Sequence, residues 1–170
     1  GPLRGVFSFA VSGTDYTYAF RNNAGATGCD LYVASGSGWT KINYKREVSF
    51  TLGGTAIPAD GATLTQGGVT ALVRRVMASS GSTSWAGTTA GRFIIDTPSG
   101  GNFIAGAATL TGGATCTLSG ADTAIAMAPG GTFEFVVSTF TGSASATRAY
   151  GCDGVNRGFE FDGTTLAPIS

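Results

Sequence analysis

Residues 148–163 read RAYGCDGVNRGFEFDG, and this stretch contains the pattern that decides the fold. Residues 148–152 and 159–162 have the composition of strands, and the dipeptides Asp153-Gly154 and Asp162-Gly163 supply the positive φ that tight hairpin turns need. In the second strand a glutamate stands between two phenylalanines, which is the alternation of a strand with one solvent-facing side. The stretch therefore predicts antiparallel strands joined by short turns.

The same pattern extends over the whole chain. Segments rich in Val, Ile, Phe, Tyr and Thr recur between Gly and Ser clusters, about a dozen in all. Only residues 123–127 have the composition of a helical turn. We therefore predict an all-β fold: an antiparallel, blade-like or sandwich sheet that carries an inserted small β-domain.

Two internal repeats indicate how these strands are organised. Residues 62–70, ATLTQGGVT, resemble residues 108–115, ATLTGGAT, and each copy predicts a strand, a glycine turn and a second strand. A second repeat joins the two ends of the chain, where residues 18–42 resemble residues 149–169 as three successive strands. We expect residues 1–43 and 131–170 to form one discontinuous, meandering, blade-like antiparallel sheet.

Residues 44–130 are then an inserted small β-domain. The ends of an inserted domain lie close together, so a hairpin loop accepts an insertion with little disturbance. Composition supports this division, because eight of the eleven phenylalanines lie in the flanking segments.

The overall composition argues against several classes of function. Lys and Arg together number 10, as do Asp and Glu, so the net charge is zero and no nucleic-acid partner is expected. The sequence has no apolar run of 18 residues and no signal-peptide pattern, so we expect no membrane association. Histidine is absent and no CxxC pair occurs, so we expect neither a metal site nor a cofactor.

The three cysteines are Cys29, Cys116 and Cys152, and they permit at most one internal disulfide. An odd number of thiols is typical of a protein assembled in a reducing cytoplasm. If any pair forms a bridge, we expect Cys29 with Cys152; whether that bridge exists stays open at this point.

Three acidic residues, Asp153, Glu160 and Asp162, lie close together in the sequence and permit two chemical interpretations. Paired carboxylates cleave glycosidic bonds when they flank the scissile oxygen, and clustered oxygen ligands in one flexible turn bind calcium. We favour a third interpretation, in which the two aspartates belong to hairpin turns and Glu160 faces outward from a strand. The sequence therefore predicts no enzyme active site.

Large aromatic and basic side chains are the remaining candidates for contact with a partner. Trp39 is expected to pack into the sheet core, whereas Trp85 lies in a polar loop and is the better candidate of the two for exposure. Both are possible partner-contact residues. In the pair Arg74-Arg75 one guanidinium must point outward, and we expect the other to pair with an acid such as Asp96.

Three segments have a distinctive sequence: residues 2–7, PLRGVF, residues 18–25, YAFRNNAG, and residues 150–163, YGCDGVNRGFEFDG. They resemble segments of large virion structural proteins of tailed bacteriophages. Residues 63–71 and 103–110 are similar to small β-modules that recur in phage tail and neck proteins. This resemblance implies β-propeller-like sheets, of which 170 residues supply one blade. With Gly1-Pro2 read as a protease-cleavage scar, we expect the chain to be an excised fragment.

The resemblance also implies a function. We expect a structural component of the phage neck or tail that acts through protein–protein contacts, is assembled in the host bacterial cytoplasm and resides in the virion. Its expected partners are other virion proteins and further copies of itself. The alternative is a carbohydrate-binding module that recognises a host-surface glycan, with Trp85 and neighbouring Tyr or Asn side chains as the platform.

Overall fold

The computed structural model describes residues 1–53, 58–80, 89–139 and 146–169. The described residues form antiparallel strands, and the predicted all-β class is confirmed. The chain divides into two compact units, Gly1–Tyr44 with Ala126–Ser170, and Lys45–Ile125. The boundaries predicted from the sequence lie after residues 43 and 130, close to those of the two units.

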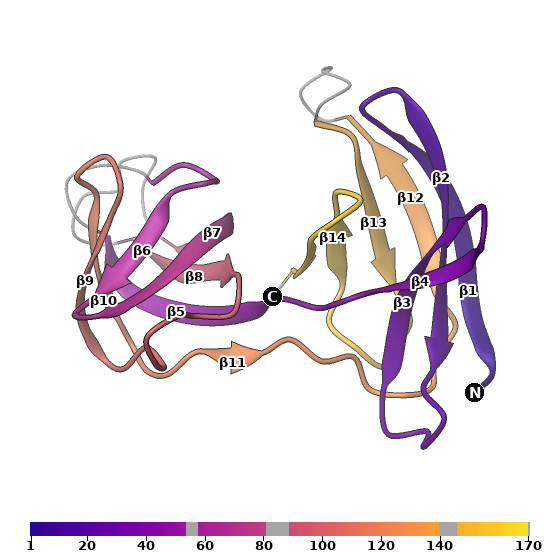
Figure 1. Cartoon of the computed structure of the whole chain (residues 1–170), viewed down its shortest axis with the longest axis horizontal. Coiled ribbons are helices and arrows are strands. Elements are labelled where there is room, and N and C mark those ends of the chain that lie inside the picture. The colour runs from indigo at the N-terminus through magenta and orange to yellow at the C-terminus, as the bar shows by residue number, and fades with distance from the viewer. Residues whose placement is uncertain (54–57, 81–88, 140–145, 170) are drawn as a thin grey trace. The chain divides into compact units, whose positions relative to one another are not determined.

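The first unit contains two four-stranded antiparallel sheets (Figure 1). One sheet is an up-and-down meander of β1 (Leu3–Val11), β2 (Thr14–Asn22), β3 (Cys29–Ser35) and β4 (Gly38–Ile42). The other is a meander of β12 (Glu134–Ser138), β13 (Arg148–Cys152), β14 (Phe159–Phe161) and β15 (Leu166–Pro168).

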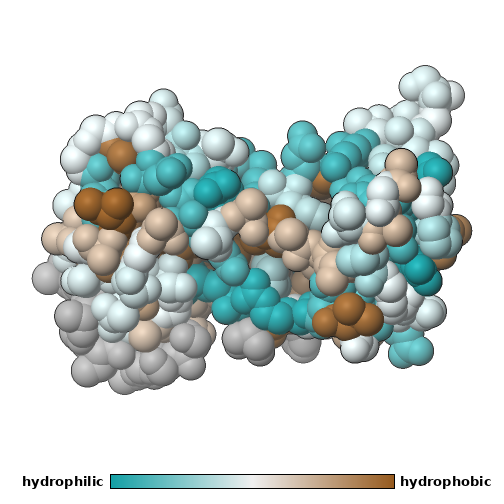
Figure 2. All heavy atoms as spheres, turned by 90° about the horizontal axis from the view of Figure 1, so that it is seen from below, coloured by the Kyte–Doolittle hydropathy of each residue, from teal (hydrophilic) through white to brown (hydrophobic). Residues whose placement is uncertain are grey.

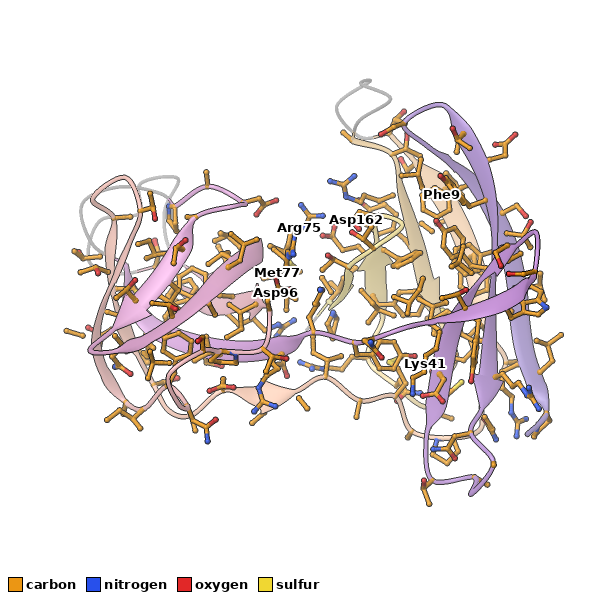
Figure 3. The ribbon with its side chains drawn as sticks, viewed as in Figure 1. Phe9, Lys41, Arg75, Met77, Asp96 and Asp162 are labelled. Atoms are coloured by element: carbon orange, nitrogen blue, oxygen red, sulfur yellow. The ribbon has the colours of Figure 1, made fainter. Side chains whose placement is uncertain are left out.

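The expectation that both flanks form one sheet is wrong. Each flank forms its own meander. The two meanders pack face to face because each has one face covered with aromatic rings, and packing removes this apolar surface from water. Phe7 of β1 stacks on Phe135 of β12 with ring centroids 4.0 Å apart, and Phe20 of β2 stacks on Phe133 at 3.9 Å. Phe9, labelled in Figure 3, meets Phe161 edge-on at 6.0 Å. The first unit is therefore a sandwich.

The repeat that joins the two ends of the chain corresponds to equivalent positions in the two sheets. The repeated segments lie in β2, β3 and β4 of one meander and in β13, β14 and β15 of the other. In both meanders these are the second, third and fourth strands.

The second unit is a barrel of six strands with one short additional strand (Figure 1). Its strand order is β10-β9-β6-β7-β8-β5, and pairing of β10 with β5 closes the sheet. The strands are β5 (Arg46–Gly53), β6 (Thr63–Gln66), β7 (Val69–Ser80), β8 (Ala90–Ile95), β9 (Gly106–Leu110) and β10 (Thr115–Leu118). The predicted helical turn at residues 123–127 is wrong, because Thr123–Ala124 form β11, which pairs with Glu47 and Arg46 of β5.

The shorter repeat forms two neighbouring hairpins of this barrel. Gly67 and Gly68 separate β6 from β7, and Gly112 and Gly113 separate β9 from β10. Gly112 and Gly113 have φ angles of 93° and 85°, which favour glycine because it lacks a Cβ. The two copies lie side by side, since Leu64 of β6 pairs with Leu110 of β9.

Candidate functional site

Of the three acidic residues near the C-terminus, Asp153 and Asp162 stabilise turns, and Glu160 lies within β14. Buried Asp153 accepts hydrogen bonds from the backbone N–H groups of Val155 at 3.0 Å and Asn156 at 2.7 Å, and also from the Asn156 side chain. Asp162 likewise accepts the N–H groups of Thr164 at 2.9 Å and Thr165 at 2.7 Å. Both carboxylates therefore serve the Asx-type turns that their Asp-Gly dipeptides predict.

No cluster of three potential His, Cys, Asp or Glu ligands for a metal ion occurs within the part of the chain that the structure describes. Cys29 and Cys116 are buried free thiols, and Cys152 is an exposed free thiol. The bridge considered between Cys29 and Cys152 is thus not formed. Burial raises the pKa of Cys29, and that of Cys116, to about 11, so neither is a thiolate at neutral pH.

The predicted ion pair of the Arg74-Arg75 segment is confirmed. Arg74 contacts Asp96 with an Nη2–Oδ2 distance of 2.6 Å, and Lys45 approaches the other carboxylate oxygen at 2.7 Å. Arg75 pairs with Asp60, so the two consecutive arginines contact different acids. Arg75 and Asp96 are labelled in Figure 3, and the register of β7 on β8 is irregular between Val73 and Arg75. The Arg74 hydrogen bond holds the pKa of Asp96 below its usual range.

Of the two tryptophans, the structure describes only Trp39. Trp85 lies outside the described residues. Trp39 does not pack into the sheet core as expected, because its side chain is 53% exposed. It lies on β4, an edge strand, opposite Ala34 of β3. The buried Leu31 and its partner Ile42 form an inward-facing pair three positions further along, and alternation over this odd number of residues turns Trp39 to the outer face of the sheet.

Trp39 borders a concavity of about 210 Å³ on the outer face of the β1–β4 sheet. Leu3 and Val6 of β1 and Tyr32 of β3 also line it, with Ala19 of β2 between them. Val6 pairs with Ala19, and Ala19 pairs with Tyr32, so these residues form one cross-strand row. The small side chain of Ala19 is buried and leaves the floor of the concavity low between larger neighbours.

The walls of this concavity are apolar and accessible. Leu3 is 60% exposed and Val6 is 50% exposed, on the side of the sheet that faces away from the aromatic core. Alternation along a half-buried strand normally places polar residues on such a face. On the face of the molecule drawn in Figure 2, apolar residues occur as small separate patches among hydrophilic ones.

Charged side chains lie beside the concavity. Lys41 of β4 forms an ion pair with Asp30 of β3 at 2.8 Å (Figure 3 labels Lys41). Arg21 lines the concavity and donates a hydrogen bond from Nε to the carbonyl oxygen of Gly1 at 2.9 Å. Within the described ranges Arg21 has no ion pair, so its terminal Nη1 and Nη2 groups keep their donors available to a ligand.

The sequence contained a signal for this site. Leu3, Val6 and Ala19 are apolar at positions where the register of a one-sided sheet calls for polar residues. These residues can be assigned to the outer face only when the register of β1 on β2 is known, because a shift of one residue exchanges the two faces of the sheet.

The described residues contain no helix that is long and apolar enough to cross a membrane. The chain matches no protein-family model, no curated protein and no solved structure.

Proposed function

We propose that this chain is a structural component of a tailed-phage particle that acts through protein–protein contacts, with the outer face of the β1–β4 sheet as its contact surface. In this role the chain has no enzymatic activity. It resides in the neck or tail of the virion, and its partners are other virion proteins. The resemblance of residues 2–7, 18–25 and 150–163 to virion proteins supports this setting.

The observation that carries the proposal is the apolar concavity bordered by Leu3, Val6 and Trp39. Exposed tryptophan and aliphatic side chains around a small depression favour association, because covering them removes apolar surface from water. Tryptophan is also among the residues that contribute most to binding energy at protein interfaces. A rigid four-stranded sheet holds these side chains in place before a partner arrives.

Site-specific photo-cross-linking during particle assembly tests this proposal. Benzoylphenylalanine replaces Trp39 in the intact protein, and the control carries the same group in place of Thr40, whose side chain lies on the opposite face of β4. We expect position 39 to cross-link to a particle protein at a defined residue and position 40 not to do so. Equal labelling at both positions, or none at position 39 in finished particles, would contradict the proposal.

A second candidate is recognition of a host-surface glycan. It is favoured by one observation, the presence of Trp39 and Tyr32 together at the concavity, since aromatic rings stack on the apolar faces of sugars. A glycan array distinguishes the candidates: saturable binding that is lost in Trp39→Ala or in Trp85→Ala supports glycan recognition. Absence of binding to host polysaccharides, together with the cross-link at position 39, supports the structural function.

A further inference from the structure

We infer that the partner segment at this concavity is acidic as well as apolar: it inserts one apolar side chain over Ala19 and places a neighbouring carboxylate on the guanidinium of Arg21. This inference rests on the proposed function and specifies the chemistry of the partner. The site is the concavity lined by Leu3, Val6, Ala19, Arg21, Tyr32 and Trp39.

The size and walls of the concavity determine the apolar part of the ligand. Its volume of about 210 Å³ suits one large side chain rather than a helix or an extended groove ligand. An apolar group lying over Ala19 contacts Val6 on one strand and Tyr32 on another, because these three residues form one cross-strand row. Burial of such a group is favourable in proportion to the apolar area that leaves water.

The charged side chains around the concavity favour an acidic group in the partner segment. Asp30 lies opposite Arg21 in the β2–β3 register, but its carboxylate contacts Lys41 at 2.8 Å. Arg21 uses Nε for the Gly1 carbonyl oxygen and has no ion pair among the described residues. A guanidinium with both terminal nitrogens available binds a carboxylate through two parallel hydrogen bonds. A basic partner meets repulsion at the same place.

The wall composition also favours a protein side chain over a sugar. The hydroxyl groups that surround a sugar ring need hydrogen-bond partners when they leave water. The side chains of Leu3 and Val6 contain no hydrogen-bonding groups, and these two residues are the most exposed aliphatic residues of the site. An apolar side chain buried against these two residues loses no hydrogen bond.

Titration of the protein with three small probes, followed by ¹⁵N NMR, tests this inference. The probes are 3-phenylpropionate, its neutral amide 3-phenylpropionamide, and glucuronate. The Trp39 indole N–H signal, assigned by its loss in Trp39→Phe, reports binding at the concavity. We expect 3-phenylpropionate to shift this signal and to bind with a dissociation constant about fivefold lower than that of the amide.

Two variants and one control sharpen the result. In Arg21→Gln the acid and the amide should bind equally, and in Ala19→Val both should bind more weakly because the added methyl groups occupy the floor. Arg157→Gln removes a positive charge from the exposed loop between β13 and β14 and should retain the preference for the acid.

Each contrary outcome overturns the inference in a distinct way. Equal affinity for acid and amide in the wild-type protein removes the acidic partner, and tighter binding of glucuronate shows a sugar site instead. If no probe shifts the Trp39 signal, the concavity does not accept an apolar group. The proposed function fails separately, through the absence of a cross-link at position 39.

Discussion

Phe20 of β2 lies flat on Phe133, which precedes β12, with ring centroids 3.9 Å apart and an angle of 6° between the ring planes. This contact joins residues 113 positions apart in the chain, and it connects the two sheets of the sandwich. Burial of the two rings against each other removes a large apolar area from water. The stability of the first unit therefore depends on residues contributed by both flanks.

Replacement of Phe20 tests this dependence directly. Phe20 is completely buried, so Phe20→Ala leaves a cavity between the sheets and should lower the free energy of unfolding by about 3–5 kcal/mol. Denaturant unfolding followed by circular dichroism measures the loss. Thr14→Ala, at an exposed position of the same strand, should change it by less than about 0.5 kcal/mol. A similar small change in both variants would show that the sheets do not depend on this contact.

Asp96 makes the stability of the barrel sensitive to acid. Its pKa is held below the ordinary value of 3.8, chiefly by the hydrogen bond from Arg74. A depressed carboxyl pKa contributes stability that is fully present above pH 3.8 and is lost as the pH falls through the folded-state value. Asp96→Asn should therefore be less stable than wild type at pH 7, and the difference should shrink as the pH falls below 3.8.

Urea unfolding at pH 7 and at pH 2.5 measures both differences. Asp15→Asn provides the control, because Asp15 is an exposed residue of β2 without an ion pair among the described residues. If the free energy of unfolding of Asp96→Asn differs from that of wild type by the same amount at both pH values, the Arg74 contact is not the source of the difference.

The three thiols should differ in reactivity. Cys152 is exposed, whereas Cys29 and Cys116 are buried with pKa values raised to about 11, so only Cys152 should react quickly with iodoacetamide in the native protein at pH 8. Mass spectrometry should show one modification in the native protein and three in denaturant. Cys152→Ser should abolish the rapid phase. Detection of a Cys29–Cys152 disulfide in freshly isolated protein would contradict the structure.

Asp153 should prove to be a residue required for stability. Asp153→Ala removes the acceptor of two backbone N–H groups and of the Asn156 side chain, and it should lower the free energy of unfolding by about 1–3 kcal/mol. Glu160→Gln serves as a comparison for catalysis, since a glycosidase would require both carboxylates. Measurable hydrolysis of a polysaccharide by the wild-type protein, abolished by both substitutions, would contradict this interpretation.

Several elements could be predicted because their determinants are local. The Asp153-Gly154 and Asp162-Gly163 turns, the glycine hairpin at Gly112-Gly113 and the alternation around Glu160 each depend on a few consecutive residues. A pairing of one of the two arginines with an acid such as Asp96 was also predicted, because Arg74 and Arg75 lie in a strand rich in apolar residues, where a charge needs a partner. The strand at Thr123–Ala124 was missed, since its pairing with β5 is a long-range contact.

The sequence by itself determined an all-β chain of short antiparallel strands, because alternation and glycine turns restrict the backbone of each segment independently of the rest. Only the tertiary structure decided that the flanks form two packed sheets, that β10 closes the barrel on β5, and that Trp39 faces outward beside Arg21. The physical reason is that these features depend on register. Both faces of the β1–β4 sheet carry apolar side chains, so composition alone does not distinguish the face that the Phe7 and Phe20 rings bury from the face that remains in water.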